Sequence, residues 1–278
     1  MSSAFSAPTP PASTQPASTP PVAPAVTKAR NIIAVASGKG GVGKTFISIT
    51  LAHALARRRR KTLLFDGDLG LANADIQLGL VPTRDLGGVM AGRITLTQSI
   101  TPFQPGGFDV IAGRSGTGTL AALAPSRLSV LSADLSELAA RYDYVVMDLG
   151  AGVDRMVRQL AFNAGVRLVV ATAEPTSMTD AYAFVKIAMA DDPNTDIRLV
   201  INQARTQQEG ERTYATLAKA CETFLKYTPP LAGVVRRDRH VSESIRAQSP
   251  ILLRYPSCEA ALDIDAIAAR LPDGGSRR

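Results

Sequence analysis

Apolar residues form short continuous runs that alternate with longer amphipathic stretches from about residue 28 onward. A short apolar run bounded by turn residues is typical of a strand that is covered on both faces. Such strands, separated by helical stretches, are typical of a mostly parallel sheet. The runs predict seven strands: Asn31–Ala36, Thr62–Phe65, Phe108–Ala112, Tyr144–Met147, Arg167–Ala171, Ile197–Ile201 and Leu231–Val235.

The amphipathic stretches between these runs predict helices. Within one of them, the segment from Ser177 to Asp180 resembles a capping box, in which a hydroxyl and a carboxylate satisfy the first backbone N–H groups of a helix. Together with the strands, the helices predict an α/β fold in which helices flank a mostly parallel sheet. The expected helices are Thr45–Arg59, Ser126–Arg141, Asp154–Asn163, Thr176–Ala190, Gly210–Lys226 and Cys258–Leu271.

The two ends of the chain do not share this pattern. Residues 1–27 contain seven prolines and no charged residue, and alanine, serine and threonine make up most of the rest. A segment of this composition does not form a packed core, and it lacks the basic start and apolar run of a secretory signal. We therefore expect a disordered tail over residues 1–27, one domain over residues 28–272 and a short flexible end over residues 273–278.

The segment Gly-Lys-Gly-Gly-Val-Gly-Lys-Thr at residues 38–45 fits the phosphate-loop pattern G-x-x-x-x-G-K-[ST]. It lies between an expected strand and an expected helix, which is the context that a phosphate loop requires. Backbone N–H groups and the positive end of the helix dipole would face the phosphates. We expect Lys44 to contact the β- and γ-phosphates and Thr45 to hold Mg²⁺. The motif predicts the three-layer P-loop NTPase fold, with these residues at the phosphates: Gly38, Lys39, Gly40, Gly41, Val42, Gly43, Lys44 and Thr45.

Three aspartates follow two of the predicted strands. Asp66 and Asp68 come after the strand Thr62–Phe65, and Asp148 comes after Tyr144–Met147. Ligands of open α/β sheets bind beyond the carboxyl ends of the strands, so these side chains should gather at the phosphate loop. A carboxylate there can support Mg²⁺, directly or through water, and another can orient the attacking water. Any single one of them could instead be a turn residue.

Composition narrows the function only in part. Apolar residues make up 45% of the chain and tryptophan is absent, so aliphatic side chains must fill the core. The net charge of +7 suits nucleic acid or anionic lipid, and equally a mildly basic soluble protein. The dense basic run Arg57–Lys61 falls where the first helix should end, a position that favours cations. Cys221 and Cys258 form no metal-spacing motif, which indicates a reducing compartment without a disulfide framework.

The phosphate loop carries a second lysine, Lys39, and so resembles the deviant loop of the MinD/ParA ATPases. Within that family, three further segments resemble the FlhG (FleN) branch, which regulates flagellar number: Asp66–Leu80, Asp148–Gly152 and Glu174–Tyr182. The likeness runs from about residue 31 to 271. It implies an ATPase that hydrolyses ATP to ADP and phosphate, with ATP and Mg²⁺ as cofactors.

The resemblance also implies roles for individual residues. Lys39 would reach across to the phosphates bound by a second copy, and Asp68 would position the attacking water. Asp148 would be linked to Mg²⁺, as Thr45 and Asp66 are expected to be. Asn202 would read the adenine base. The segment Val235–Asp238, with Asp238 at its end, would lie on the other side of that base.

The family further implies a homodimer when ATP is bound, which signals to a protein partner such as a flagellar GTPase or a transcription regulator. Residues 1–27 show no counterpart of the short motif by which FlhG proteins engage the GTPase FlhF. The last helix carries Glu259, Asp263 and Asp265, whereas membrane-cycling relatives carry a basic helix at this end. We expect a cytoplasmic protein, with the inner face of the cell membrane as the alternative place of action.

Other function classes stay open at this stage. A ParA-like ATPase that partitions DNA or cargo would use the basic balance for non-specific contacts with nucleic acid, although nucleic acid is not the favoured partner. An electron-transfer enzyme on the same scaffold would need cysteines near the carboxylate segments, and Cys221 and Cys258 are not there. An ATP-dependent ligase would need a substrate pocket that the sequence does not reveal. We expect His53 to be a packing residue and His240 a loop or cap residue, rather than acid–base catalysts.

Overall fold

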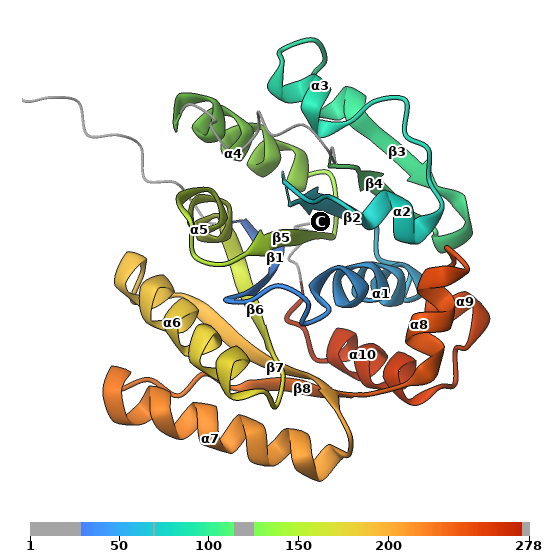
Figure 1. Cartoon of the computed structure of the whole chain (residues 1–278). Coiled ribbons are helices and arrows are strands. Elements are labelled where there is room, and N and C mark those ends of the chain that lie inside the picture. Colours follow the sequence, from blue (N-terminus) through green and yellow to red (C-terminus); the bar gives the residue numbers. More distant parts are fainter. Residues whose placement is uncertain (1–28, 69, 114–124, 274–278) are drawn as a thin grey trace, which may run out of the picture.

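The computed structural model describes residues 29–68, 70–113 and 125–273 (Figure 1). The predicted tail over residues 1–27 lies outside the described residues, as does most of the predicted C-terminal end over residues 273–278. Among the described residues, no helix is both long enough and apolar enough to cross a membrane.

One sheet of eight strands forms the centre of the fold (Figure 1). Its strands are β1 Ala29–Ser37, β2 Thr62–Gly67, β3 Ile100–Phe103, β4 Phe108–Ile111, β5 Tyr144–Ala151, β6 Ala164–Ala171, β7 Asp196–Ala204 and β8 Leu231–Arg236. Their order across the sheet is β3-β4-β2-β5-β1-β6-β7-β8. All neighbouring strands run parallel except β3 and β4, so the prediction of a mostly parallel sheet is confirmed.

The edge strand β3 is the one strand of the described sheet that the sequence pattern missed. It is four residues long, and Pro102 interrupts its ability to donate ladder hydrogen bonds. Proline is tolerated in strands at edges, where one side of the backbone has no strand neighbour. A short, half-exposed segment with a proline does not stand out as a buried apolar run.

Ten α-helices lie between or after the strands of the described chain: α1 Lys44–Arg57, α2 Ala74–Leu78, α3 Leu86–Met90, α4 Pro125–Ala139, α5 Arg155–Phe162, α6 Pro175–Asp191, α7 Gln207–Leu225, α8 Arg239–Arg246, α9 Ile251–Arg254 and α10 Glu259–Ala269. The six predicted helices correspond to α1, α4, α5, α6, α7 and α10. The other four have four to eight residues each, too few turns for a clear helical period in the sequence.

Helices cover both faces of the sheet and make the three layers expected of the P-loop fold (Figure 1). Leu135 of α4, Phe184 of α6 and Leu217 of α7 belong to one apolar cluster. Leu51 of α1 and Ile264 of α10 belong to a second cluster on the other face. Residues of the central strands alternate between the two clusters, as side chains of a strand must. This doubly covered sheet explains the continuous apolar runs.

The predicted capping box at the start of α6 is wrong. The helix begins earlier, at Pro175, whose fixed φ suits the first helical position. Ser177 therefore lies inside the helix and is buried. Its hydroxyl accepts a hydrogen bond from the N–H of Thr172 at 3.0 Å, which ties the helix to the end of β6.

The basic run after α1 has structural partners, as predicted. The Arg58 guanidinium donates hydrogen bonds to the carboxylate of Asp265 in α10, one of them at 2.8 Å. Arg60 pairs with Asp273 at 2.8 Å. These ion pairs connect the segment after α1 with α10 and with the residues that follow it, so part of the run's charge is used within the fold.

Candidate functional site

The turn between β1 and α1 has the backbone form of an anion site. Gly41 and Gly43 have φ values of 79° and 92°, a left-handed conformation that glycine adopts without strain. Gly43 is the N-cap of α1, and no side chain caps the first N–H groups of the helix. These groups and the positive end of the helix dipole therefore remain available to a bound anion.

The turn also fits closely against the rest of the molecule. A Cβ atom added to Gly38 would lie 2.1 Å from the carbonyl oxygen of Asp180 in α6, so only glycine fits there. Asn202 Nδ2 donates to the carbonyl of Val42 at 2.7 Å, and Gln203 Nε2 donates to that of Gly41 at 3.3 Å. Two amide side chains at the end of β7 thus hold loop carbonyls away from the space that the N–H groups face.

Lys44 begins α1 and points back along the loop. Its Nζ donates to Ser37 Oγ at 3.0 Å, and that hydroxyl donates to the carbonyl of Lys39 at 2.6 Å. Burial lowers the pKa of Lys44, while the charges of Asp148 and Asp68 act in the opposite direction. The ammonium group is therefore held among polar partners, close to two carboxylates.

Thr45 and Ser48 converge on Asp148. Thr45 Oγ1 donates to Asp148 Oδ2 at 2.6 Å, and Ser48 Oγ donates to Asp148 Oδ1 at 3.0 Å. The carboxylate lies on β5 and is 1% exposed. The first turn of the helix and the carboxyl end of the central strand are thereby joined through one side chain.

Asp66 lies beside Asp148 in the sheet, because the two residues are paired in the register of β2 and β5. The Asp66 carboxylate accepts hydrogen bonds from the N–H groups of Asp68 at 3.2 Å, Asn73 at 3.2 Å and Ala74 at 3.0 Å. Burial raises the pKa of both Asp66 and Asp148, and the charge of Asp148 raises that of Asp66 further. Two adjoining buried carboxylates of this kind favour a cation.

Asp68 follows β2 and lines a cavity of about 540 Å³ beside the phosphate loop. Its Oδ1 accepts hydrogen bonds from the N–H groups of Gly70 at 3.3 Å and Leu71 at 3.0 Å. The predicted site residues that line this cavity come from the loop, from the start of α1 and from the residue after β2: Gly40, Gly41, Gly43, Lys44, Thr45 and Asp68. Asp66 and Asp148 lie beneath this wall through the contacts described above.

Lys39 extends away from the loop toward α6 of its own chain. Its Nζ lies 2.7 Å from Glu174 Oε2 and 3.0 Å from Thr176 Oγ1. The Lys39 side chain is 38% exposed and the Glu174 side chain is 66% exposed. An exposed ion pair of this kind contributes little to stability, so the lysine can leave it at low cost.

Asp238 stands apart from the residues that line the cavity. It is the N-cap of α8, and its Oδ1 accepts a hydrogen bond from the N–H of His240 at 2.9 Å. The same oxygen lies 2.8 Å from His240 Nδ1. Its carboxylate is therefore used at the start of a helix, and a contact from this segment to a base would come from its backbone or its neighbours.

The histidines have the environments expected of structural residues. His53 is buried in α1 against the ring of Phe108. Burial lowers its pKa to about 4, so the ring is neutral at physiological pH. His240 is half-buried in the first turn of α8.

Sequence analysis did not identify Ser37, Ser48, Glu174 or Gln203 as part of the site. Ser37 directly precedes the motif and Ser48 follows its last residue by three positions, so both could have been suspected from their places in the sequence. Glu174 and Gln203 reach the loop only through the packing of α6 and β7, which no local pattern reveals.

Comparisons with known proteins agree with this geometry. Residues 33–251 match the CobQ/CobB/MinD/ParA nucleotide binding domain. The chain is similar to the antiactivator FleN of Pseudomonas aeruginosa, with 37% identity over 240 residues that cover 86% of this chain and 85% of FleN. It is also similar to the flagellum site-determining protein YlxH of Helicobacter pylori, with 33% identity over 241 residues that cover 86% and 81%. The solved structure of the Pyrococcus furiosus cell division ATPase MinD has a TM-score of 0.74 at 26% identity, covering 87% of this chain and 97% of MinD.

Proposed function

Because the chain belongs to the CobQ/CobB/MinD/ParA nucleotide-binding family, we propose that it is a switch in which bound ATP joins two copies of the chain and hydrolysis separates them. The family membership confirms the MinD/ParA-type ATPase predicted from the sequence, and the likeness to FleN and YlxH confirms the predicted resemblance to the FlhG branch. The observation that carries the proposal is the contact between Thr45 and Asp148 at 2.6 Å, which joins the last residue of the phosphate-loop motif to a buried carboxylate of β5.

The oxygen donors at this point fit Mg²⁺. Thr45, Asp66 and Asp148 offer a hydroxyl and two carboxylates, and hard oxygen ligands are the ones that Mg²⁺ takes. Burial of the two carboxylates raises their pKa, and a nearby divalent cation would act in the opposite direction by favouring the charged form. When bound, Mg²⁺ would neutralise charge on the phosphate oxygens.

The other steps of the cycle are carried out by the chain's own residues. Lys44 and the loop N–H groups hold the phosphates, and Asp68 orients the attacking water from the cavity wall. Lys39 leaves Glu174 and reaches the phosphates of the second copy, where it supplies the charge that an arginine finger supplies in other NTPases. Asn202 and the segment 235–238 bound the base. Hydrolysis stays slow until the second copy completes the site.

We place this cycle in the cytoplasm, in the control of flagellar number or placement. The likeness to YlxH and FleN supports this assignment. The protein partner that senses the dimer would be a flagellar GTPase or a transcription regulator.

Two variants test the switch. Asp68→Ala should bind ATP normally, lose roughly 100-fold or more of the hydrolysis rate and accumulate as a dimer, because the water loses its orienting group. Lys44→Ala should weaken ATP binding by roughly 10- to 100-fold, because a hydrogen bond to a charged group contributes about 1.5–3 kcal/mol. Calorimetry and size-exclusion chromatography with light scattering, both with Mg²⁺, measure these effects. An Asp68→Ala variant that binds ATP but stays monomeric would contradict the proposal.

A further inference from the structure

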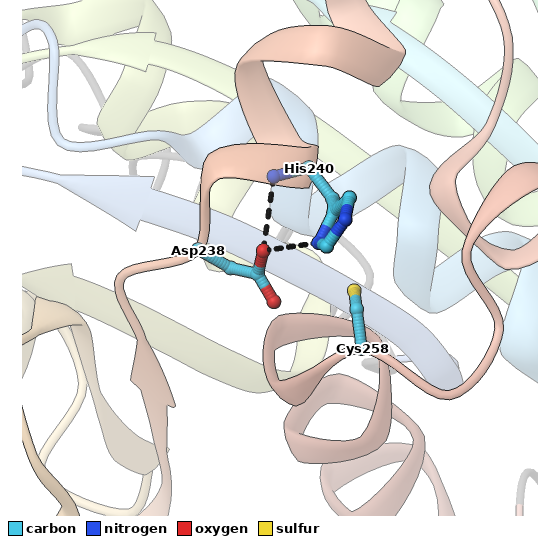
Figure 2. Close-up of side chains that lie close together, drawn as sticks. All are labelled: Asp238, His240 and Cys258. Atoms are coloured by element: carbon cyan, nitrogen blue, oxygen red, sulfur yellow. Dashed lines mark hydrogen bonds and ion pairs between the residues drawn. The ribbon is translucent and has the colours of Figure 1, made fainter.

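We propose that Asp238, His240 and Cys258 form a binding site for a transition-metal ion, with Zn²⁺ as the preferred ion. Figure 2 shows these three side chains converging from the start of α8 and the start of α10. Each offers one ligand atom: a carboxylate oxygen, an imidazole nitrogen and a thiol sulfur. None of the three residues lines the cavity beside the phosphate loop, so the cluster is separate from the part of the site that would hold the phosphates and Mg²⁺.

The spacing of the ligand atoms is close to what a tetrahedral ion needs. The three atoms lie within 4.8 Å of one another, and Asp238 Oδ1 and His240 Nδ1 are 2.8 Å apart. Zinc bonds of about 2.0–2.3 Å place neighbouring ligand atoms roughly 3.3–3.8 Å apart. Rotation of the Cys258 side chain, and a slight widening of the Asp238–His240 contact as its hydrogen bond is exchanged for the ion, would bridge the difference.

The local fold holds two of the ligands in place before any ion arrives. Asp238 is anchored as the N-cap of α8. The ring of Tyr255 lies 4.3 Å from that of His240, centroid to centroid, and restricts rotation of the imidazole. Ligands that are already oriented lose little entropy on binding.

The mixture of donors selects the kind of ion. Thiolate and imidazole are ligands of Zn²⁺ and its transition-metal neighbours, whereas Mg²⁺ and Ca²⁺ take oxygen ligands. Three protein ligands leave a fourth position for water, as in open zinc sites. The site is therefore chemically distinct from the all-oxygen donor set at Thr45, Asp66 and Asp148.

Acidic side chains offset part of the basic charge that flanks the cluster at Arg236, Arg237 and Arg239. Arg236 is close by in sequence, but its guanidinium pairs with Asp263 at 2.8 Å and also contacts Glu259. Burial, together with the neighbouring Asp238 carboxylate, raises the pKa of the Cys258 thiol to about 11. A divalent ion between thiolate and carboxylate would remove that repulsion, so binding should displace the thiol proton.

The test uses the full chain without an affinity tag, metal or nucleotide, and Co²⁺ as a spectroscopic probe for the zinc site. We expect a thiolate-to-cobalt charge-transfer band in the near ultraviolet that saturates at one ion per chain and is displaced by Zn²⁺. Cys258→Ser should abolish this band, and serine keeps the N-cap of α10 intact. His240→Ala and Asp238→Asn should each weaken binding by about tenfold or more, since even changes to residues behind the ligands cost this much.

Cys221→Ser is the matched control, because Cys221 is the other cysteine of the chain and lies buried in α7. It should leave the cobalt spectrum unchanged. The absence of a thiolate band in the unmodified chain, or a band that survives Cys258→Ser, would overturn the proposal. A separate readout is thermal unfolding: Zn²⁺ should raise the midpoint of the unmodified chain and of Cys221→Ser, but not of Cys258→Ser. Nucleotide is absent throughout, so failure here is distinguishable from failure of the proposed ATP switch.

Discussion

At the scale of single residues, the buried polar groups differ in whether they have partners. Asp148 is held by two hydroxyls, and Asp66 accepts three backbone hydrogen bonds. His53 is different, because its Nδ1 is buried and has no hydrogen-bond partner. Burial disfavours the charged form of such a ring, so the ring stays neutral in the folded chain. It takes up a proton when the chain unfolds.

This environment predicts how stability depends on pH. The pKa of His53 is about 4 in the folded chain and about 6.5 when unfolded, so between these values the unfolded chain binds a proton that the folded chain does not. The stabilisation is present above about pH 6.5 and is lost as pH falls toward 4. Between about pH 7.5 and pH 5 the free energy of unfolding should fall by roughly 2 kcal/mol from this residue alone.

Urea unfolding of the unmodified chain and of His53→Leu at these two pH values checks the prediction. Asp66 and Asp148 titrate in both proteins, so their effects cancel in the comparison. The leucine variant should lose roughly 2 kcal/mol less on acidification. An identical pH dependence in the two proteins would show that the ring is not protonated on unfolding.

At the scale of elements, close approaches of backbones decide which substitutions the fold accepts. Gly210 lies in the first turn of α7, where the helix packs on β8. A Cβ atom there would lie 2.3 Å from Cγ1 and 2.7 Å from Cγ2 of Val234. The helix α7 can therefore pack this close to β8 only because residue 210 has no Cβ atom.

Gly210→Ala should destabilise the chain by about 1–3 kcal/mol, because overpacking outweighs the roughly 1 kcal/mol that alanine contributes through helix propensity. Denaturant unfolding measures the change. Val234→Ala removes the two crowded methyl groups, so Gly210→Ala should cost less in that background. If Gly210→Ala lowers the free energy of unfolding equally with and without Val234→Ala, the strain does not come from the contact with Val234.

At the scale of the whole molecule, the features of the proposed switch lie on one face. Leu71 lines the cavity and is 76% exposed, and Ile76 in the adjacent α2 is 53% exposed. Exposed apolar side chains beside a cavity are typical of a surface that another protein covers. A second copy of the chain would cover them when ATP is bound.

Lys39→Ala should leave ATP binding within a few-fold of normal but abolish both dimerisation and hydrolysis, because the lysine acts on the other copy. Glu174→Gln is the control, since it removes the ion pair of Lys39 and keeps the lysine. It should dimerise at least as readily as the unmodified chain. Light scattering and phosphate release with ATP and Mg²⁺ measure the outcomes, and normal turnover of Lys39→Ala would rule out the role across the interface. Salt-sensitive binding of the ATP-bound form to arbitrary duplex DNA would instead favour the ParA-like alternative.

The local sequence pattern was sufficient to predict the elements that are uniformly buried. The strands β1, β5 and β6 are covered on both faces, so their apolar runs are unmistakable, and the phosphate loop is defined by consecutive residues. The local sequence pattern was insufficient where the position or role of a residue depends on contacts with segments far away in the sequence. Pro102 hides the edge strand β3, α8 is short and polar, and Gln203 reaches Gly41 only because β7 ends beside the loop. Asp238 and Cys258 are 20 residues apart, so their proximity follows from the fold and from no motif.

The backbone conformation of Gln203 affects the selection of heat-resistant variants of this protein. Its φ of 58° is left-handed, which costs a residue other than glycine about 1 kcal/mol. Gln203→Gly should therefore raise the melting temperature, yet it deletes the amide that holds Gly41 and should weaken nucleotide affinity. A screen for heat resistance alone would therefore favour a variant that binds nucleotide less tightly. At this position, thermal stability and nucleotide affinity are in conflict.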